Sequence, residues 1–132
     1  MGAVALDASI LIAFLEPADT HHARAVSELR AVRTRGDEFV LPISVLSEVM
    51  VGGYRNGTAP ELFRSLAGLF GPARRPDEAI ALKAAELRAR RSSLRLPDAF
   101  VIATGIVDNA TVLTCDLRLA GVDPRVQVLD AS

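Results

Sequence analysis

The chain has 132 residues, 50% of them hydrophobic, with a formal net charge of −1 at pH 7 and one cysteine. This length suits a single domain over residues 1–132 that buries about two thirds of its unfolded surface. One cysteine excludes an intrachain disulfide framework, and the apolar run at residues 10–15 is far shorter than the roughly 20 residues of a membrane span. We therefore expect a soluble, cytoplasmic protein with no membrane partner and with Cys115 as a small core residue.

The N-terminal part of the chain alternates short apolar strands with helices. Its patterns predict strands over residues 3–6 and 38–41 and helices over residues 9–15 and 19–35. His21 and His22 lie in the first turn of the second helix. Adjacent helical residues point about 100° apart, so these histidines make a poor metal pair, and we expect them to be exposed to solvent.

Two helices with a surplus of apolar residues are predicted for the middle of the chain. Pro42 opens the first, and Thr58-Ala-Pro-Glu61 has the spacing of a capping box that starts the second, which continues to Phe70. Together they carry more apolar residues than one inward face can use: Val45, Val49, Met50, Val51, Tyr54, Leu62, Phe63, Leu66, Leu69 and Phe70. Such a surplus commonly marks an interface, so we expect a homodimer and a groove that accepts a helix of a partner.

The C-terminal half contains the most apolar helix of the chain. An amphipathic helix over residues 77–91 precedes it, and it begins at Leu96-Pro97 and ends at about Asn109. A β-branched strand at 111–114, a short helical turn at 116–119 and a last strand at 125–129 follow. Strands separated by helices indicate an α/β fold with a mostly parallel central sheet flanked by helices.

Four apolar segments each contain, or run into, one isolated acid: Asp7, Glu48, Asp98 and Asp116. An acid in a first helical turn, such as Asp98, commonly caps the helix and complements its dipole. An isolated carboxylate in an apolar setting is unfavourable unless it is paired or bound to a metal, and these runs offer no nearby Lys or Arg. In open parallel sheets, ligands bind outside the carboxyl ends of the strands. Asp7 and Asp116 follow strands and the other two acids lie near helix starts, so all four can converge in one crevice.

Converging carboxylates need cations. Two unit charges about 5 Å apart repel by roughly 3 kcal/mol at an effective dielectric constant of about 20. A site of carboxylates without cysteine or histidine favours Mg²⁺ or Mn²⁺ over Zn²⁺, and such a site suits phosphodiester hydrolysis. Between Gly71 and Pro97, the sequence contains seven basic and three acidic residues. The arginines in this stretch either form a solvated helix face or contact phosphates.

The acids stand in motifs that resemble those of the PIN domain and, more narrowly, of VapC-type toxins from bacterial toxin–antitoxin pairs. The motifs are Asp7-Ala-Ser9, Glu48, Leu96-Pro-Asp98-Ala-Phe-Val-Ile-Ala-Thr104 and Thr114-Cys-Asp116, and they span essentially the whole chain. The resemblance implies a Rossmann-like fold and a metal-dependent endoribonuclease that is inhibited by a small cognate antitoxin of the VapB type. It also implies homodimerisation.

The resemblance assigns roles to particular residues. Asp7, Glu48, Asp98 and Asp116 would hold one or two Mg²⁺ or Mn²⁺ ions, with Ser9 and Thr114 as polar support. Our candidates for contacts to RNA phosphates are Arg88, Arg91, Arg95 and Arg118. Many relatives carry another acid shortly after the last motif, whereas Leu117-Arg118-Leu119 stands here. The number of ions is therefore left open.

Two other functions fit part of the pattern. A receiver-like signalling module also binds Mg²⁺ through carboxylates at strand ends, but it needs a lysine after a late strand, and the only lysine here, Lys83, lies within a predicted helix. A catalytically silent PIN-like RNA-binding domain would not need all four acids.

Overall fold

The fold is built on a five-stranded sheet in the order β3-β2-β1-β4-β5. The computed structural model describes residues 2–131. The strands are β1 (Ala3–Leu6), β2 (Glu38–Pro42), β3 (Ala73–Arg74), β4 (Thr111–Thr114) and β5 (Val126–Val128). The predicted α/β class is confirmed, and every strand pairing is parallel. Strand β3 went unpredicted because it has only two residues and neither is β-branched.

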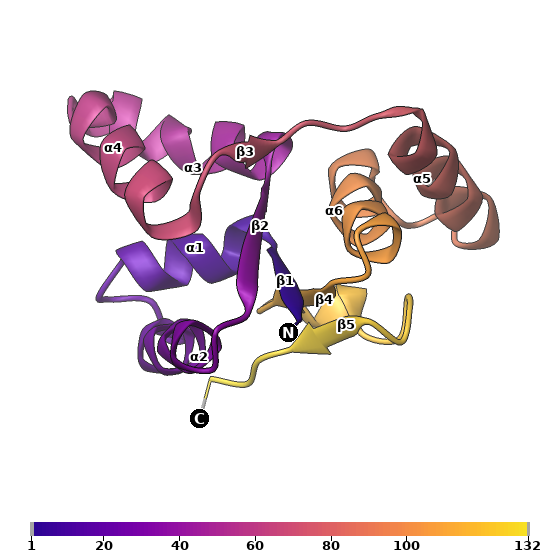
Figure 1. Cartoon of the computed structure of the whole chain (residues 1–132), viewed down its shortest axis with the longest axis horizontal. Coiled ribbons are helices and arrows are strands. Elements are labelled where there is room, and N and C mark those ends of the chain that lie inside the picture. The colour runs from indigo at the N-terminus through magenta and orange to yellow at the C-terminus, as the bar shows by residue number, and fades with distance from the viewer. Residues whose placement is uncertain (1, 132) are drawn as a thin grey trace.

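Helices cover the sheet from two sides (Figure 1), with α1 and α2 on one side and α5 and α6 on the other. They are α1 (Ala8–Leu15), α2 (His22–Thr34), α3 (Ile43–Asn56), α4 (Ala59–Phe70), α5 (Glu78–Arg90) and α6 (Leu96–Val107), with a 3₁₀ turn η1 (Leu117–Leu119). Helix α6 packs on β1 and β4 and is mostly buried, as its composition predicts. No helix within residues 2–131 has the length and apolar character to cross a membrane.

Two details of the helix starts differ from the predictions. Helix α2 begins at His22, because the Asp19 carboxylate accepts the backbone N–H of His21 (2.8 Å) in a turn before the helix. Both histidines are half-buried rather than exposed, and His22 Nδ1 lies 2.8 Å from the Ala13 carbonyl oxygen. Thr58 forms no capping box, because its backbone N–H donates to the Gly53 carbonyl at the end of α3 and its φ and ψ of −118° and 19° are not those of an extended cap residue.

The predicted apolar surplus of α3 and α4 divides between core and surface. Half of the ten residues are buried: Val45, Val49, Met50, Leu66 and Phe70. Val51, Tyr54, Phe63 and Leu69 are exposed, and Ile43 at the start of α3 joins them. The surplus is therefore smaller than the sequence suggests, because α3 and α4 pack against α1 and β2 as well as against each other.

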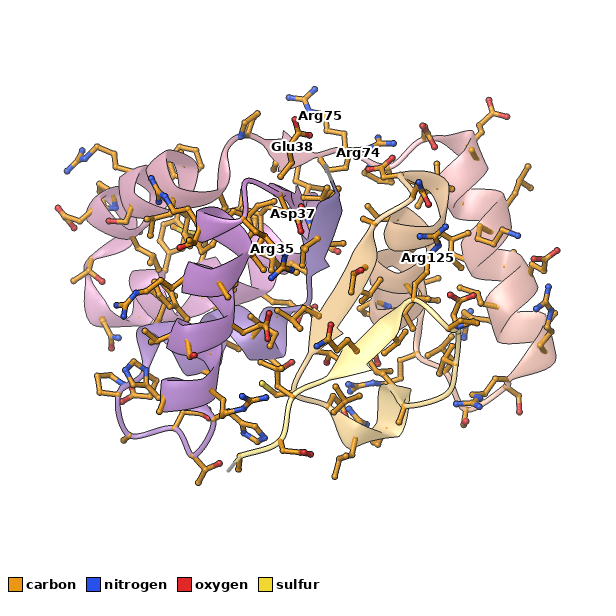
Figure 2. All side chains as sticks on the ribbon, turned by 60° about the horizontal axis from the view of Figure 1, so that its bottom comes forward. Arg35, Asp37, Glu38, Arg74, Arg75 and Arg125 are labelled. Atoms are coloured by element: carbon orange, nitrogen blue, oxygen red, sulfur yellow. The ribbon has the colours of Figure 1, made fainter. Side chains whose placement is uncertain are left out.

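Arginines at the amino edge of the sheet donate to neighbouring polar side chains. Arg35 and Asp37 precede β2 and Arg125 precedes β5 (Figure 2), so they lie at the ends where the parallel strands begin. Arg35 Nε donates to Asp37 Oδ2 (2.6 Å), and Arg125 Nη2 donates to Asn109 Oδ1 (2.6 Å). Asp7 and Asp116 come just after β1 and β4, so these two acids lie at the opposite edge.

Candidate active site

Asp7 is fixed at the carboxyl end of the central strand β1. Its residue is only 7% exposed, and it stands directly before α1 without making a side-chain cap hydrogen bond. Instead, its Oδ2 accepts hydrogen bonds from Ser9 Oγ and from Thr114 Oγ1, each at 2.7 Å. Two hydroxyl groups from separate elements therefore set the orientation of this carboxylate.

The same hydroxyls bind the backbone after β4. Ser9 Oγ accepts the N–H of Cys115 (2.9 Å), and Thr114 Oγ1 accepts the N–H of Asp116 (3.0 Å). Each hydroxyl has one hydrogen, which its bond to Asp7 uses, so the 3.1 Å contact between the two hydroxyl oxygens carries no hydrogen bond of its own. This hydroxyl bridge, formed by Ser9 and Thr114, ties the ends of β1 and β4 together and places Asp7 relative to Asp116.

Glu48 on α3 and Asp98 on α6 face the charge of Asp7. Glu48 is an exposed residue, but partial desolvation of its carboxyl raises its pKa, and the charges of Asp7 and Asp98 raise it further. Burial likewise raises the pKa of Asp98, with the Asp7 charge adding to the shift and Arg95 opposing it. The carboxylates of three separate elements thus lie close enough to repel one another.

Asp98 does not cap its helix. The residue at the cap position of α6 is Arg95, and no side-chain cap hydrogen bond is made there. The Asp98 carboxylate, which is 14% exposed, accepts a hydrogen bond from Arg95 Nε at 3.3 Å instead. The hydrogen-bonding cap is therefore absent, although Asp98 lies in the first turn of α6, where its charge complements the helix dipole.

Asp116 is held by Arg118. The guanidinium spans both carboxylate oxygens, with Nη2 at 2.6 Å from Oδ2 and Nε at 3.1 Å from Oδ1. These hydrogen bonds lower the pKa of Asp116. The prediction that the acidic runs lack a nearby basic residue is therefore wrong, because Arg95 and Arg118 reach across the short spacings of three and two residues to Asp98 and Asp116.

The donor chemistry of the four acids fits a hard divalent cation, because all four offer carboxylate oxygens. Their side chains are not gathered as a metal shell: within residues 2–131 no group of three or more His, Cys, Asp or Glu side chains is grouped so that it could hold an ion. The ion pairs of Asp98 and Asp116 give one reason, since they hold these carboxylates against arginines. A metal would require at least Asp116 to share or release its guanidinium partner.

Three of the four candidate arginines line one hollow beside the acids. The hollow measures about 250 Å³ and is lined by Arg91, Ser93, Leu94, Arg95, Asp98, Arg118 and Leu119. The fourth, Arg88, donates from Nε to the Leu94 carbonyl (3.1 Å) and so stabilises the connection between α5 and α6. We refer to the hollow lined by Arg91, Arg95 and Arg118 as the arginine hollow.

Cys115 is unsuited to nucleophilic chemistry. It is half-buried against the core, and burial raises the pKa of its thiol to about 11. At neutral pH it therefore stays a thiol rather than the reactive thiolate.

Comparison with known proteins agrees with this architecture. A family model described as the PIN domain matches residues 4–123. No curated protein sequence matches the chain. A toxin–antitoxin complex from Klebsiella pneumoniae is 23% identical, with a TM-score of 0.76 and coverage of 95% of this chain and 96% of that one. FitAcB from Neisseria gonorrhoeae is 22% identical, with a TM-score of 0.77 and coverage of 97% of both chains. VapBC2 from Rickettsia felis, bound to a DNA fragment from its promoter, is 14% identical, with a TM-score of 0.78 and coverage of 97% and 99%.

Proposed function

The chain belongs to the PIN domain family, and from this premise we propose that it is a metal-dependent endoribonuclease toxin of the VapC type, restrained by a cognate antitoxin. The observation that supports the proposal is that acids from separate elements lie near enough for their charges to interact: Glu48 with Asp7 and Asp98, and Asp98 with Asp7 and Asp116. Asp7 follows β1, Glu48 lies on α3, Asp98 on α6 and Asp116 after β4. Desolvation raises the pKa values of Glu48 and Asp98, and the charges of the neighbouring acids raise them further.

Asp7, Glu48, Asp98 and Asp116 would hold one or two Mg²⁺ or Mn²⁺ ions, which supply activation of water and neutralisation of charge at the reacting phosphate. The hydroxyl bridge fixes Asp7, so one ligand is preorganised before any ion binds. Guanidinium groups of the arginine hollow would bind phosphate oxygens of the RNA next to the carboxylates, where arginine geometry suits such contacts.

The exposed apolar residues of α3 and α4 supply a surface for partners. A groove of about 670 Å³ runs between these helices, lined by residues that include Ile43, Met50, Tyr54 and Phe63. Tyr54 is 75% exposed and Phe63 51%. We infer that this face forms the homodimer contact and, with the adjoining groove, the docking place of an antitoxin helix. The similarity of the fold to toxins solved in toxin–antitoxin complexes supports this inference.

The test is cleavage of a synthetic single-stranded RNA by purified protein. We expect cleavage with Mg²⁺ or Mn²⁺, loss of cleavage in EDTA and recovery when the metal is restored in excess. Asp7→Asn, purified in parallel, reports contamination by other nucleases, and a DNA strand of the same sequence tests the preference for RNA. Undiminished cleavage in EDTA would refute the proposal. Binding of RNA without cleavage under every metal condition would favour the silent RNA-binding domain.

A further inference from the structure

The carboxylate of Asp116 already has a cationic partner. Arg118 donates to Asp116 Oδ2 from Nη2 (2.6 Å) and Nε (3.2 Å), and to Oδ1 from Nε (3.1 Å). The backbone N–H of Arg118 also donates to Oδ1 (2.9 Å). A cation approaching Asp116 therefore meets two oxygens that are both hydrogen-bonded to the same residue, as well as the positive charge of its guanidinium.

Arg118 has freedom to leave this position. Its side chain is 65% exposed, whereas that of Asp116 is 20% exposed. An ion pair of this exposure contributes little net stability, so a divalent cation can displace it at modest cost. The backbone hydrogen bond to Asp116 Oδ1 does not depend on the side chain, and it can keep the carboxylate in place while the guanidinium moves.

The released guanidinium would remain beside the site. Arg118 lines the arginine hollow together with Arg91, Arg95 and Asp98. A phosphate group entering this hollow would bring negative charge to a space lined by three arginines. An arginine that has lost its carboxylate partner gains a new bidentate acceptor there.

We propose that Arg118 is a built-in counter-ion of the site, which competes with the divalent cation for Asp116 and, once displaced, binds an RNA phosphate in the arginine hollow. The inference rests on the proposed function, since it assigns the cation to Asp116. Arg118 is thus a positioning residue with opposite effects on the two ligands: it weakens the binding of metal and strengthens the binding of RNA. Loss of a merely structural side chain would weaken both.

The first test is Mn²⁺ binding to the RNA-free protein, measured by isothermal titration calorimetry. Arg118→Gln removes both the positive charge and the guanidinium group that bonds to both Asp116 oxygens. We expect this variant to bind Mn²⁺ about fivefold more tightly, because an exposed ion pair contributes at most about that factor. Arg118→Lys keeps the charge without the guanidinium group, so its Mn²⁺ affinity should lie between those of Arg118→Gln and wild type. Arg91→Gln is the matched control for charge in the same hollow, because within residues 2–131 Arg91 has no carboxylate partner at ion-pair distance, and its effect should stay below about twofold.

The second test follows the side chain directly. In ¹⁵N-labelled protein, the Nε–H resonance of Arg118 should shift as Mg²⁺ is added, with the same midpoint as the calorimetric transition. In cleavage assays, Arg118→Gln should lower the Mn²⁺ concentration needed for half-activation while raising KM for RNA.

The outcomes separate this inference from the proposed function. The inference would be overturned if wild type bound Mn²⁺ as tightly as Arg118→Gln or more tightly. It would also be overturned if the Arg118 resonance stayed unchanged at saturating Mg²⁺. Either result would leave the nuclease proposal standing. Absence of Mn²⁺ binding by every protein would overturn both.

Discussion

Replacing Thr114 with valine tests the hydroxyl bridge at its most buried point. Thr114 is fully buried, and Thr114→Val keeps the shape of the side chain while it removes the hydroxyl. The variant loses a hydrogen bond to the Asp7 carboxylate (2.7 Å), which is worth about 1.5–3 kcal/mol because the acceptor is charged. It also leaves the Asp116 N–H without its 3.0 Å acceptor, at a cost of about 1 kcal/mol for a part-buried amide. We expect a loss of roughly 3 kcal/mol in the free energy of unfolding.

The measurement is urea unfolding in EDTA, so that no bound metal contributes. Thr111→Val on the same strand is the matched control, since the Thr111 hydroxyl has no hydrogen-bond partner within residues 2–131, and its effect should lie within about 0.5 kcal/mol of zero. Thr114→Ser keeps the hydroxyl and loses one methyl group, so it should cost only about 1 kcal/mol. A loss below about 1 kcal/mol for Thr114→Val, or equal losses for the valine and serine variants, would refute the assigned hydrogen bonds.

Three further predictions follow from the acids and the apolar face. Asp98→Asn removes repulsion among carboxylates, so in EDTA it should stabilise the protein by on the order of 1 kcal/mol. Unlike wild type, it should gain little stability from Mn²⁺ in thermal melts. Identical melts for the two proteins would contradict this prediction. Because the pKa of Glu48 is raised above its ordinary 4.5, the folded protein holds a proton there that the unfolded chain has already released. Raising the pH above 4.5 should therefore reduce the free energy of unfolding of wild type in EDTA. Glu48→Gln should show a smaller decrease when urea unfolding is measured across the same pH range. Equal decreases for wild type and Glu48→Gln would contradict this role of Glu48. Phe63→Glu should convert a dimer to a monomer in light scattering without changing the circular dichroism spectrum, and a wild-type monomer at micromolar concentration would count against the interface.

Much of the fold could be predicted from the sequence because its elements carry strong local patterns. Helix α6 is apolar on nearly every face and has Pro97 in its first turn, β1 is a short apolar run, and β4 is rich in β-branched residues. The element boundaries depend on local competition that no pattern reveals. Asp19 caps a turn rather than α2, and the backbone of Thr58 closes α3 instead of opening α4 with a capping box.

The candidate site divides in the same way. The placement of Asp7 and Asp116 at the same edge follows from topology, because residues after parallel strands meet at one edge of the sheet. The ion pairs of Asp98 and Asp116 depend on how far two arginine side chains reach back over the backbone, which the spacing alone does not determine. The spacing of three residues between Arg95 and Asp98 was the signal available, since such pairs lie on one face of a helix start.

Binding of Mn²⁺ to variants of the four acids tests the central claim most directly. The claim is that Asp7, Glu48, Asp98 and Asp116 form one site for divalent cations. Calorimetry should therefore show that Mn²⁺ affinity falls on the order of tenfold or more in each of four variants: Asp7→Asn, Glu48→Gln, Asp98→Asn and Asp116→Asn. Glu86→Gln, which alters an exposed acid paired with Lys83 on α5, should bind Mn²⁺ as wild type does. Four variants that retain wild-type affinity, or a loss confined to one of them, would contradict a shared site.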